Sequence, residues 1–434
     1  MESAAKGHEY ASEWKRHWPL PLVAMLGITG PAAYSYASGI FMTAMTGEFG
    51  WSRTEFSSAF TLQMMLGLLV VPVAGRILDK VGPRRMALMG IIPFALILSC
   101  LGFANGNIWQ WLLLSALLPI GTALVMPTIW ITGVVRSFEA ARGTALAISL
   151  AGIGVATAIW PLLAAYFIDA FGWRLAFGAI GLSYAAVILP LTWLMYKPAE
   201  LAPLAGDASR EKEPSEALPR LLPIFRSANF IGLLVAGGLF AFAQLGMIYH
   251  FAPLAQAQGL TLGEAAQVAA IVGIFSIIGR LGTGFLLDWL PLRPLAIGAF
   301  SLLLLSIFLL FTADGSGFQL SAAAVVLGLA AGCEMDVLTF VASRRFDSRI
   351  FGSAYASLSV GLGIMASMGP LAAGKLFDMF GSYDRFLILA AVCDAIAILA
   401  ILIVLSPRFG PLQNVAIASA PGVSVNNASS ADTE

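Results

Sequence analysis

Charged residues are scarce in this chain: Asp, Glu, Lys and Arg make up 11% of its 434 residues, against roughly a quarter of a typical soluble domain. That composition excludes an ordinary water-soluble fold. The 24 basic and 24 acidic residues also leave a net charge of zero, so no overall field favours nucleic acid or another polyanionic partner.

Cysteines and catalytic motifs are scarce too. The three cysteines, Cys100, Cys333 and Cys393, lie inside apolar runs, where neither a disulfide framework nor a closely spaced zinc site is expected. The sequence has no metal-ligand cluster of His, Asp and Glu, no G-x-S-x-G elbow and no nucleotide-binding loop. We therefore predict that the protein is not an enzyme and has no resident cofactor or metal.

The N-terminus lacks the pattern of a cleavable signal. Lys15 and Arg16 precede an apolar segment that is too long for the hydrophobic region of a signal peptide and has no small-residue cleavage site. We expect the first span to stay in the protein.

Apolar residues, in contrast, make up 59% of the chain. They gather in runs of about 20 residues, the length that crosses a hydrocarbon core about 30 Å thick. The runs predict an all-α membrane protein with twelve transmembrane helices, at residues 19–46, 54–75, 86–105, 109–134, 143–169, 175–196, 226–253, 263–286, 294–312, 319–341, 351–377 and 384–406.

Two polar stretches divide the chain. Residues 197–220 and the residues after Pro411 have the composition of solvated, disordered segments. The predicted parts are a cytoplasmic N-terminal segment 1–18, a six-helix half 19–196, a cytoplasmic linker 197–225, a second six-helix half 226–406 and a disordered cytoplasmic tail 407–434.

Lys and Arg are distributed unevenly over the connections. The N-terminal segment, the even-numbered connections and the tail hold nearly all of them, whereas the opposite loops hold only Arg53, Arg174 and Arg385. Since connections rich in Lys and Arg stay on the cytoplasmic side, both termini are predicted to be cytoplasmic.

The two halves repeat each other at one fixed offset. Asp79 and Asp288 lie 209 positions apart, and the same offset relates Gly75 to Gly284, Arg84 to Arg293, Pro161 to Pro370, Asp169 to Asp378 and Gly172 to Gly381. The repeat predicts two pseudo-symmetric halves in parallel orientation, with a substrate site at their interface.

The connection between the second and third predicted spans reads GRILDKVGPRR, residues 75–85. A Gly-Pro pair suits a tight turn, and arginines on the cytoplasmic side resist translocation. The stretch matches the G-x-x-x-D-x-x-G-x-[RK]-[RK] motif of the major facilitator superfamily, which the chain resembles over its whole topology. The matching residues are Gly75, Asp79, Gly82, Arg84 and Arg85.

This resemblance implies the major facilitator fold and a role for the motif as a conformational gate. In the family, the carboxylate of Asp79 would pair with positive charge and a helix N-terminus of the other half when the cytoplasmic side is closed. Asp288 is its counterpart in the second half. The alternative is an exposed loop carboxylate that only balances the neighbouring arginines.

Two further stretches narrow the resemblance. GEFGWSRTEFSSAFTL, residues 47–62, and GCEMDVLTFVASRRF, residues 332–346, are similar to bacterial monocarboxylate and oxalate-type organic anion transporters and to related anion:cation symporters. The first span, GITGPAAYSYASGIF, has no acid where animal monocarboxylate carriers have an aspartate. The fifth span, GIGVATAIWPLLAAYF, lacks the full G-x-x-x-G-P-x-x-G-G pattern of drug antiporters.

Arg280 is the deepest predicted cation. It precedes Asp288, at the end of its span, by eight residues, or about 12 Å at 1.5 Å per residue. A guanidinium cannot lose its proton there, so it needs a carboxylate partner. The resemblance implies that an arginine in the eighth span binds substrate; the alternative is a permanent pair with Glu334 or Asp336.

Glu334, Asp336 and His250 are the candidates for proton coupling. The two acids, two positions apart, point about 200° apart on a helix, so one can titrate during transport while the other pairs with a neighbour. The alternative is two structural acids. His250 stands beside Phe251 near the end of its span, a place that favours a structural histidine.

Three more residues complete the predicted binding site. Tyr34 and Tyr36 lie among small residues of the first span, and Lys375 lies in the eleventh. A lysine so close to the interface can instead extend outward to it.

Taken with the resemblance, these observations predict a secondary transporter that moves a small mono- or dicarboxylate across a bacterial inner membrane by alternating access, with proton symport. The expected partners are the carboxylate substrate, protons and the lipid bilayer, with no nucleic acid, and the protein is expected to be a monomer. An anion exchanger and a sugar or drug carrier of the same superfamily are the alternatives.

Overall fold

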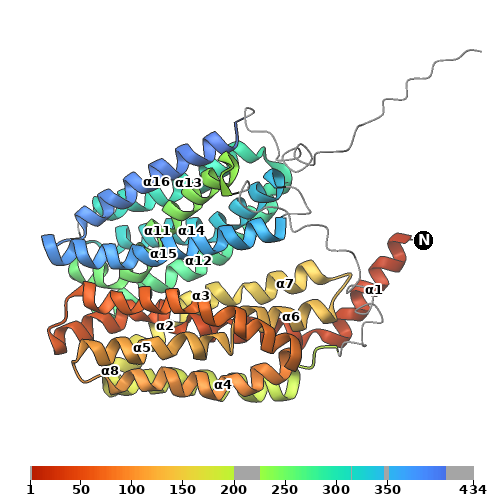
Figure 1. Ribbon diagram of the computed structural model, residues 1–434, viewed down its shortest axis with the longest axis horizontal. Coiled ribbons are helices and arrows are strands. Elements are labelled where there is room, and N and C mark those ends of the chain that lie inside the picture. Colours follow the sequence, from red (N-terminus) through yellow and green to blue (C-terminus); the bar gives the residue numbers. More distant parts are fainter. Residues whose placement is uncertain (1, 200–224, 314, 347–350, 407–434) are drawn as a thin grey trace, which may run out of the picture.

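The computed structural model describes residues 2–199, 225–313, 315–346 and 351–406. Within these ranges the chain is helical throughout, with no strand, and it forms two bundles (Figure 1). The first bundle contains α1 (Glu2–His17), α2 (Pro19–Phe49), α3 (Arg53–Val81), α4 (Pro83–Cys100), the short 3-10 helix η1 (Leu101–Phe103), α5 (Ile108–Ala123), α6 (Pro127–Ser137), α7 (Arg142–Leu150) and α8 (Gly152–Met195). The second contains α11 (Ala228–Ala257), α12 (Leu262–Trp289), α13 (Leu292–Phe311), α14 (Gly317–Arg345), α15 (Phe351–Phe380) and α16 (Asp384–Val404).

These helices confirm the predicted fold of twelve spans. Ten helices of the described part are long and apolar enough to cross a membrane, when residues 142–195 count as one. That segment reverses at Gly172, where φ is 76°, so it supplies two spans. The 31-residue α2 supplies the twelfth.

Two spans are broken where the sequence predicts continuous helices. The fourth is divided into α5 and α6 because Pro127, at the start of α6, has no backbone N–H to continue the helix before it. The fifth is divided into α7 and α8 at Ala151. The second break lies beside the pocket described below.

The turns repeat as the sequence does. Positive φ angles occur in three glycine pairs separated by the same 209 positions: Gly50 and Gly259, Gly106 and Gly315, Gly172 and Gly381. All three pairs lie at the end of the bundle opposite α1, which we call the far end; the other is the α1 end (Figure 1). Because residues other than glycine rarely adopt positive φ, the chain reverses at equivalent glycines in the two halves.

The halves meet where glycine allows backbones to approach. Gly39 of α2 faces the Tyr249 carbonyl of α11, and Gly374 of α15 faces the Arg53 backbone of α3. Gly154 of α8 and Gly273 of α12 face each other, and a Cβ on Gly273 would lie 2.6 Å from the Gly154 oxygen. Three helix pairs therefore form the interface between halves.

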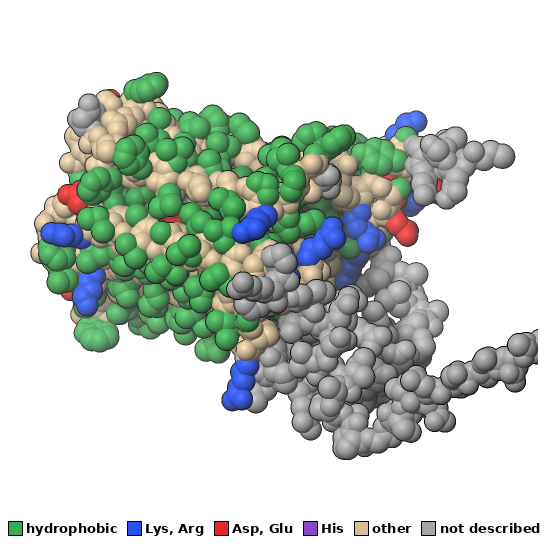
Figure 2. All heavy atoms as spheres, turned by 90° about the horizontal axis from the view of Figure 1, so that it is seen from above, with side chains coloured by type: hydrophobic (Ala, Val, Ile, Leu, Met, Phe, Trp, Pro, Cys, Tyr) green, Lys and Arg blue, Asp and Glu red, His purple; other side chains and the backbone are tan. Residues whose placement is uncertain are grey.

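The outside of the bundle is apolar. Large hydrophobic side chains are exposed along the spans, among them Leu69 at 71% and Phe285 at 63%, and they cover most of the face in Figure 2. In a bilayer this surface contacts lipid tails, and helices satisfy most backbone polar groups within each segment. The protein is thus a multi-pass membrane protein.

Candidate functional site

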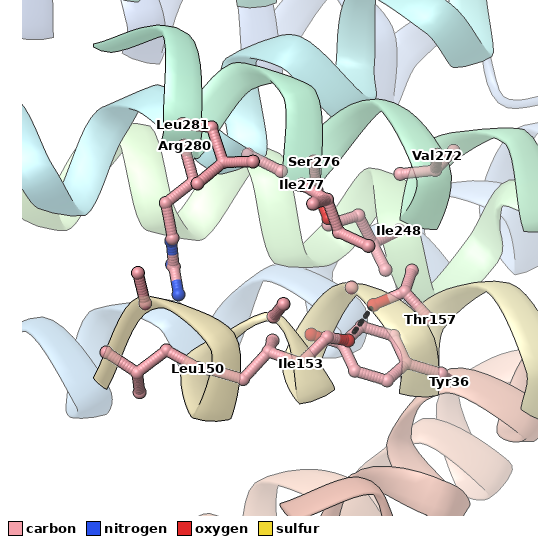
Figure 3. Close-up of a pocket in the computed structure, with 14 residues that line it drawn as sticks. Tyr36, Leu150, Ile153, Thr157, Ile248, Val272, Ser276, Ile277, Arg280 and Leu281 are labelled. Atoms are coloured by element: carbon pink, nitrogen blue, oxygen red, sulfur yellow. Dashed lines mark hydrogen bonds between the residues drawn. The ribbon is translucent and has the colours of Figure 1, made fainter. Parts of the chain in front are cut away.

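A pocket lies between the two halves, lined mainly by α7 and α8 of the first half and by α12 of the second (Figure 3). Its cavity volume is about 50 Å³, within about 500 Å³ of space between atoms that includes open solvent. The residues that line it are mostly aliphatic, with hydroxyl groups and one guanidinium: Tyr36, Ala147, Leu150, Ala151, Ile153, Gly154, Thr157, Ile248, Val272, Ser276, Ile277, Arg280, Leu281 and Ala331.

Arg280 stands at one end of this pocket. Its side chain extends from α12 toward α7 and α8 of the other half (Figure 3). The Nε atom lies 3.8 Å from Asp336 Oδ2 on α14, and both side chains are about one-third exposed or less. In the described part of the chain the terminal nitrogens have no hydrogen-bond partner, so the planar fork is free to meet a carboxylate.

Hydroxyl side chains also line the pocket. Thr157 donates to the Ile153 carbonyl at 2.9 Å, as the dashed line in Figure 3 shows, and Ser276 donates to the Gly273 carbonyl at 2.8 Å. The oxygens of both hydroxyl groups can still accept a hydrogen bond. Tyr36 lines the same pocket.

The two acids of α14 occupy different environments, as their spacing predicts. Asp336 meets Arg280, whereas Glu334 is 2% exposed and its Oε1 has no hydrogen-bond partner among the described residues. Burying a carboxylate oxygen without a hydrogen bond is costly. Glu334 is therefore a buried acid on the same helix as Asp336, outside the residues that line the pocket.

His250 lies away from the pocket, in a buried cluster at the far end. Its Nε2 atom is 2.9 Å from the Pro370 carbonyl oxygen and 3.1 Å from Ser57 Oγ. Its Nδ1 atom is 2.9 Å from Tyr383 Oη. The Ser57 contact joins α11 to α3 across the interface between halves, and the Pro370 contact joins α11 to α15 within the second half.

Beside this cluster, Asp378 of α15 caps the N-terminus of α3. Its carboxylate accepts from the backbone N–H of Arg53 at 2.9 Å and of Thr54 at 2.8 Å, and also from the Thr54 hydroxyl. The Arg53 guanidinium stacks on Phe377, 3.4 Å from the ring centroid, and donates to Tyr383 Oη. Helix N-termini attract anions through their free N–H groups and dipole.

The two other predicted contact residues lie outside the pocket. Tyr34 is 2% exposed, and its hydroxyl is 3.4 Å from that of Tyr249 on α11. Lys375 is exposed on α15. Of the predicted binding residues, Arg280 and Tyr36 share the pocket.

The motif of residues 75–85 lies at the α1 end. Gly82, with φ 83°, reverses the chain between α3 and α4, and Arg84 Nη2 donates to the Trp193 carbonyl of its own half at 2.8 Å. Arg85 and Asp79 are exposed, Gly75 is half-buried, and Asp79 has no hydrogen bond or ion pair within the described ranges. The side chain of Asp288 lies outside the described residues.

Helix α1 is attached to the first half by an acid, by the Tyr10 hydroxyl, which donates to Thr144 Oγ1 at 3.1 Å, and by an aromatic contact. Glu13 accepts from the backbone N–H groups of Glu139, Ala140 and Ala141 at 2.9 to 3.0 Å. Burial raises the pKa of Glu13, but the three N–H donors together lower it by more, so the carboxyl has a pKa below its ordinary value. Trp14 packs on Phe138 of the same connection.

Sequence reasoning missed several polar residues. Asp394 of α16 is fully buried, with neither carboxylate oxygen hydrogen-bonded to a described residue, and an acid inside a 21-residue apolar helix is a signal that could have found it. No such signal in the sequence singles out Thr157, Ser276, Arg53 or Tyr383. Their roles depend on neighbours distant in sequence.

Comparisons with known proteins agree with the architecture. The family model described as Major Facilitator Superfamily matches residues 23–317, more than half of the chain. "Monocarboxylate transporter 11" of Mus musculus is 28% identical over 68% of this chain and 66% of its own length. "Probable L-galactonate transporter" of Escherichia coli (strain K12) is 26% identical over 56% of this chain and 55% of its own length.

The chain thus spans about two thirds or less of the length of these relatives. Among solved structures, the D-xylose-proton symporter superposes with a TM-score of 0.69, covering 91% of this chain and 98% of the symporter at 17% identity. That likeness concerns the fold.

Proposed function

The chain belongs to the Major Facilitator Superfamily, and from that premise we propose that it is a secondary transporter of a small organic anion, moved with protons by alternating access of its two halves. The α1 end is cytoplasmic in this proposal, and the membrane is a bacterial inner membrane. The enrichment of Lys and Arg in the connections of that end supports the orientation.

One observation carries the choice of substrate. Arg280 is the single charged residue among those that line the pocket, and its terminal nitrogens have no partner in the described part of the chain. A guanidinium fork binds a carboxylate bidentately. Asp336, on the Nε side, orients the fork without occupying it.

The remaining lining suits an organic acid with one carboxylate. Aliphatic walls from Ile153, Ile248 and Val272 can enclose a small apolar body, and the hydroxyls of Tyr36 and Thr157 can bind one polar substituent. A second carboxylate would find no second cation among these lining residues. We therefore favour a monocarboxylate over a dicarboxylate.

Glu334 is the proposed proton carrier. It lies two positions from Asp336 on α14, is buried, and has an unpaired carboxylate oxygen within the described ranges. Glu334→Gln should abolish accumulation driven by a pH gradient while substrate binding persists. Asp336→Asn is the matched variant; if both retain proton-driven accumulation, neither acid couples protons.

Reconstituted protein tests the function itself. Proteoliposomes are offered a panel of radiolabelled mono- and dicarboxylates, sugars and cationic drugs, with and without an imposed pH gradient. Uptake of a monocarboxylate that requires the gradient is the expected result. Uptake that needs internal anion but no gradient would indicate exchange, and selective uptake of a sugar or a drug would refute the anion proposal.

A further inference from the structure

The far-end cluster around His250 has a consequence for how the closed far end responds to acid. The far-end junction consists of Arg53 and Ser57 of α3 in the first half, and of His250, Pro370, Asp378 and Tyr383 in the second. None of these residues lines the pocket.

Hydrogen-bond chemistry assigns the protons of His250. The Pro370 carbonyl can only accept, so the Nε2 atom 2.9 Å away bears hydrogen. Arg53 can only donate, so it donates to Tyr383 Oη. The Tyr383 hydroxyl in turn donates to His250 Nδ1, 2.9 Å away. The junction is satisfied when the imidazole is neutral, with its proton on Nε2.

The charged and titratable groups around His250 come from each neighbouring element. Arg53 approaches from α3 and opposes a positive imidazolium, whereas Asp378 on α15 favours one. Asp378 is already bonded to the α3 N-terminus. Three tyrosines are also near His250. Tyr383 lies just before α16, and Tyr249 lies next to His250 on α11. Tyr34 of α2 contacts Tyr249.

A proton on Nδ1 would disrupt this order. The new N–H would face Tyr383 Oη, which already accepts from Arg53, and the Tyr383 hydrogen would lose its acceptor. Within the described residues Tyr383 Oη has no further partner. A buried donor without an acceptor, and two cations directed at one oxygen, both destabilise the contact.

The contact that would be lost joins the two halves. Arg53 belongs to the first half and Tyr383 to the second, and Ser57 adds a contact of the first half to Nε2. We propose that the far-end junction is a latch that holds only while His250 is neutral, so that protonation of His250 releases the far end and favours its opening. The proposal rests on the alternating-access function, which it deepens by adding a proton-sensitive step at the far end.

The direction follows from linkage. Once the far end is open, water reaches the imidazole, and a solvated histidine titrates near its ordinary pKa of about 6.5. If the closed state excludes the added proton, the ratio of open to closed molecules rises by up to about tenfold for each pH unit below that value. Above about pH 7.5 the ratio should not depend on pH.

The test measures the distance across the far end without any substrate. Full-length protein in lipid nanodiscs carries Ala in place of Cys100, Cys333 and Cys393, and nitroxide labels on Trp109→Cys and Phe318→Cys. These two exposed positions, at the far-end starts of α5 and α14, belong to different halves. Distance distributions are recorded by electron–electron double resonance between about pH 8 and pH 5.

The short distance should predominate at pH 8, and the long-distance population should rise as the pH falls through about 6.5. His250→Gln should remove this response, and His17→Gln, which changes a histidine of α1, should retain it. Tyr383→Phe, which cannot donate to Nδ1, should show the long distance already at pH 8. Three outcomes would each overturn the proposal: a parent that shows no pH response, a His250→Gln variant that responds to pH as the parent does, or a Tyr383→Phe variant that keeps the short distance at pH 8. Because no substrate is present, a failure to transport organic anions does not affect the outcome.

Discussion

Arg280 shows how a single side chain limits what the pocket can bind. It stays charged at any physiological pH, and Asp336 compensates that charge at a distance of 3.8 Å, from the Nε side alone. The fork remains directed across the interface between halves (Figure 3). Shape, as much as charge, therefore determines binding at this position.

Arg280→Lys separates shape from charge. Lysine keeps the positive charge but loses the planar fork, and losing one hydrogen bond to a charged group costs about 1.5 to 3 kcal/mol. The concentration of monocarboxylate for half-maximal uptake should rise about 10- to 100-fold, with normal expression. An unchanged value, or rescue of Arg280→Ala by neutralising Asp336 or Glu334, would mean that the arginine is structural.

At the scale of elements, α8 and α12 cross beside the pocket at Gly154 and Gly273. A methyl group on Gly273 would come within 2.6 Å of the Gly154 oxygen and nearer still to the Ala158 nitrogen. Backbone atoms of a packed helix cannot move aside cheaply. The close approach is possible because neither glycine has a side chain.

Gly273→Ala should therefore force the two helices apart. Overpacking of this kind costs about 1 to 3 kcal/mol, so we expect a lower thermal unfolding temperature and slower uptake. Gly282→Ala on the same helix is the control, because its Cβ would meet no atom within 4 Å. If both variants unfold and transport alike, the crossing does not depend on glycine.

The attachment of α1 is expected to depend on pH. The pKa of Glu13 is lowered by its three backbone donors, so the contribution to docking is complete above the ordinary pKa of about 4.3 and is lost as the pH falls through the lowered value. Glu13→Gln should raise hydrogen exchange of residues 139–141 about 2- to 30-fold at neutral pH, the range for losing a helix cap.

Hydrogen exchange followed by mass spectrometry measures both effects, at pH 7 and after acidification. Glu9→Gln, which changes an exposed acid one turn earlier, should exchange as the parent does. Equal protection in Glu13→Gln and the parent would show that the remaining contacts, the aromatic pair of Trp14 with Phe138 and the hydrogen bond of Tyr10 with Thr144, suffice to hold the helix.

At the scale of the whole molecule, the charged residues that bond across the two halves within the described ranges lie at the far end, whereas uncharged contacts such as Thr61 with the Ser367 carbonyl and Tyr34 with Tyr249 lie deeper in the bundle. Asp378 and Tyr383 join the second half to α3 there, whereas Asp79 at the α1 end is exposed and, among the described residues, unbonded. A carrier that alternates its access needs one end released while the other is joined. We interpret Asp79 as a contact reserved for the opposite state.

Asp79→Asn should then impair transport without impairing insertion. A carboxylate at a helix N-terminus contributes about 0.3 to 1 kcal/mol, and roughly 2 kcal/mol when partly buried, so the state closed at the α1 end should lose roughly 2- to 30-fold in population. Uptake rates in proteoliposomes should fall accordingly. Glu139→Gln, the control, removes an exposed acid at the same end and should transport normally. Uptake by Asp79→Asn at the parent rate would contradict the gate hypothesis.

Composition and local pattern were enough to predict the spans, the repeat and the turn at Gly82. Apolar runs form spans because transfer into lipid depends on each segment's own residues, and the positive-φ glycines occur at matched positions because their constraint is local. Arg280 and the acids of α14 could be singled out for the same reason, since a charge inside an apolar run is costly wherever its partner lies.

Which polar groups meet was decided by the tertiary structure alone. Asp378 and Arg53 are 325 positions apart, and His250 and Tyr383 are 133 apart, so no local pattern relates them. Helix packing directed Asp336 rather than Glu334 toward Arg280, and it placed Tyr36 in the pocket but Tyr34 outside it. Such contacts depend on the rotation and depth of each helix against its neighbours, which are collective properties of the packed bundle and not of any single segment.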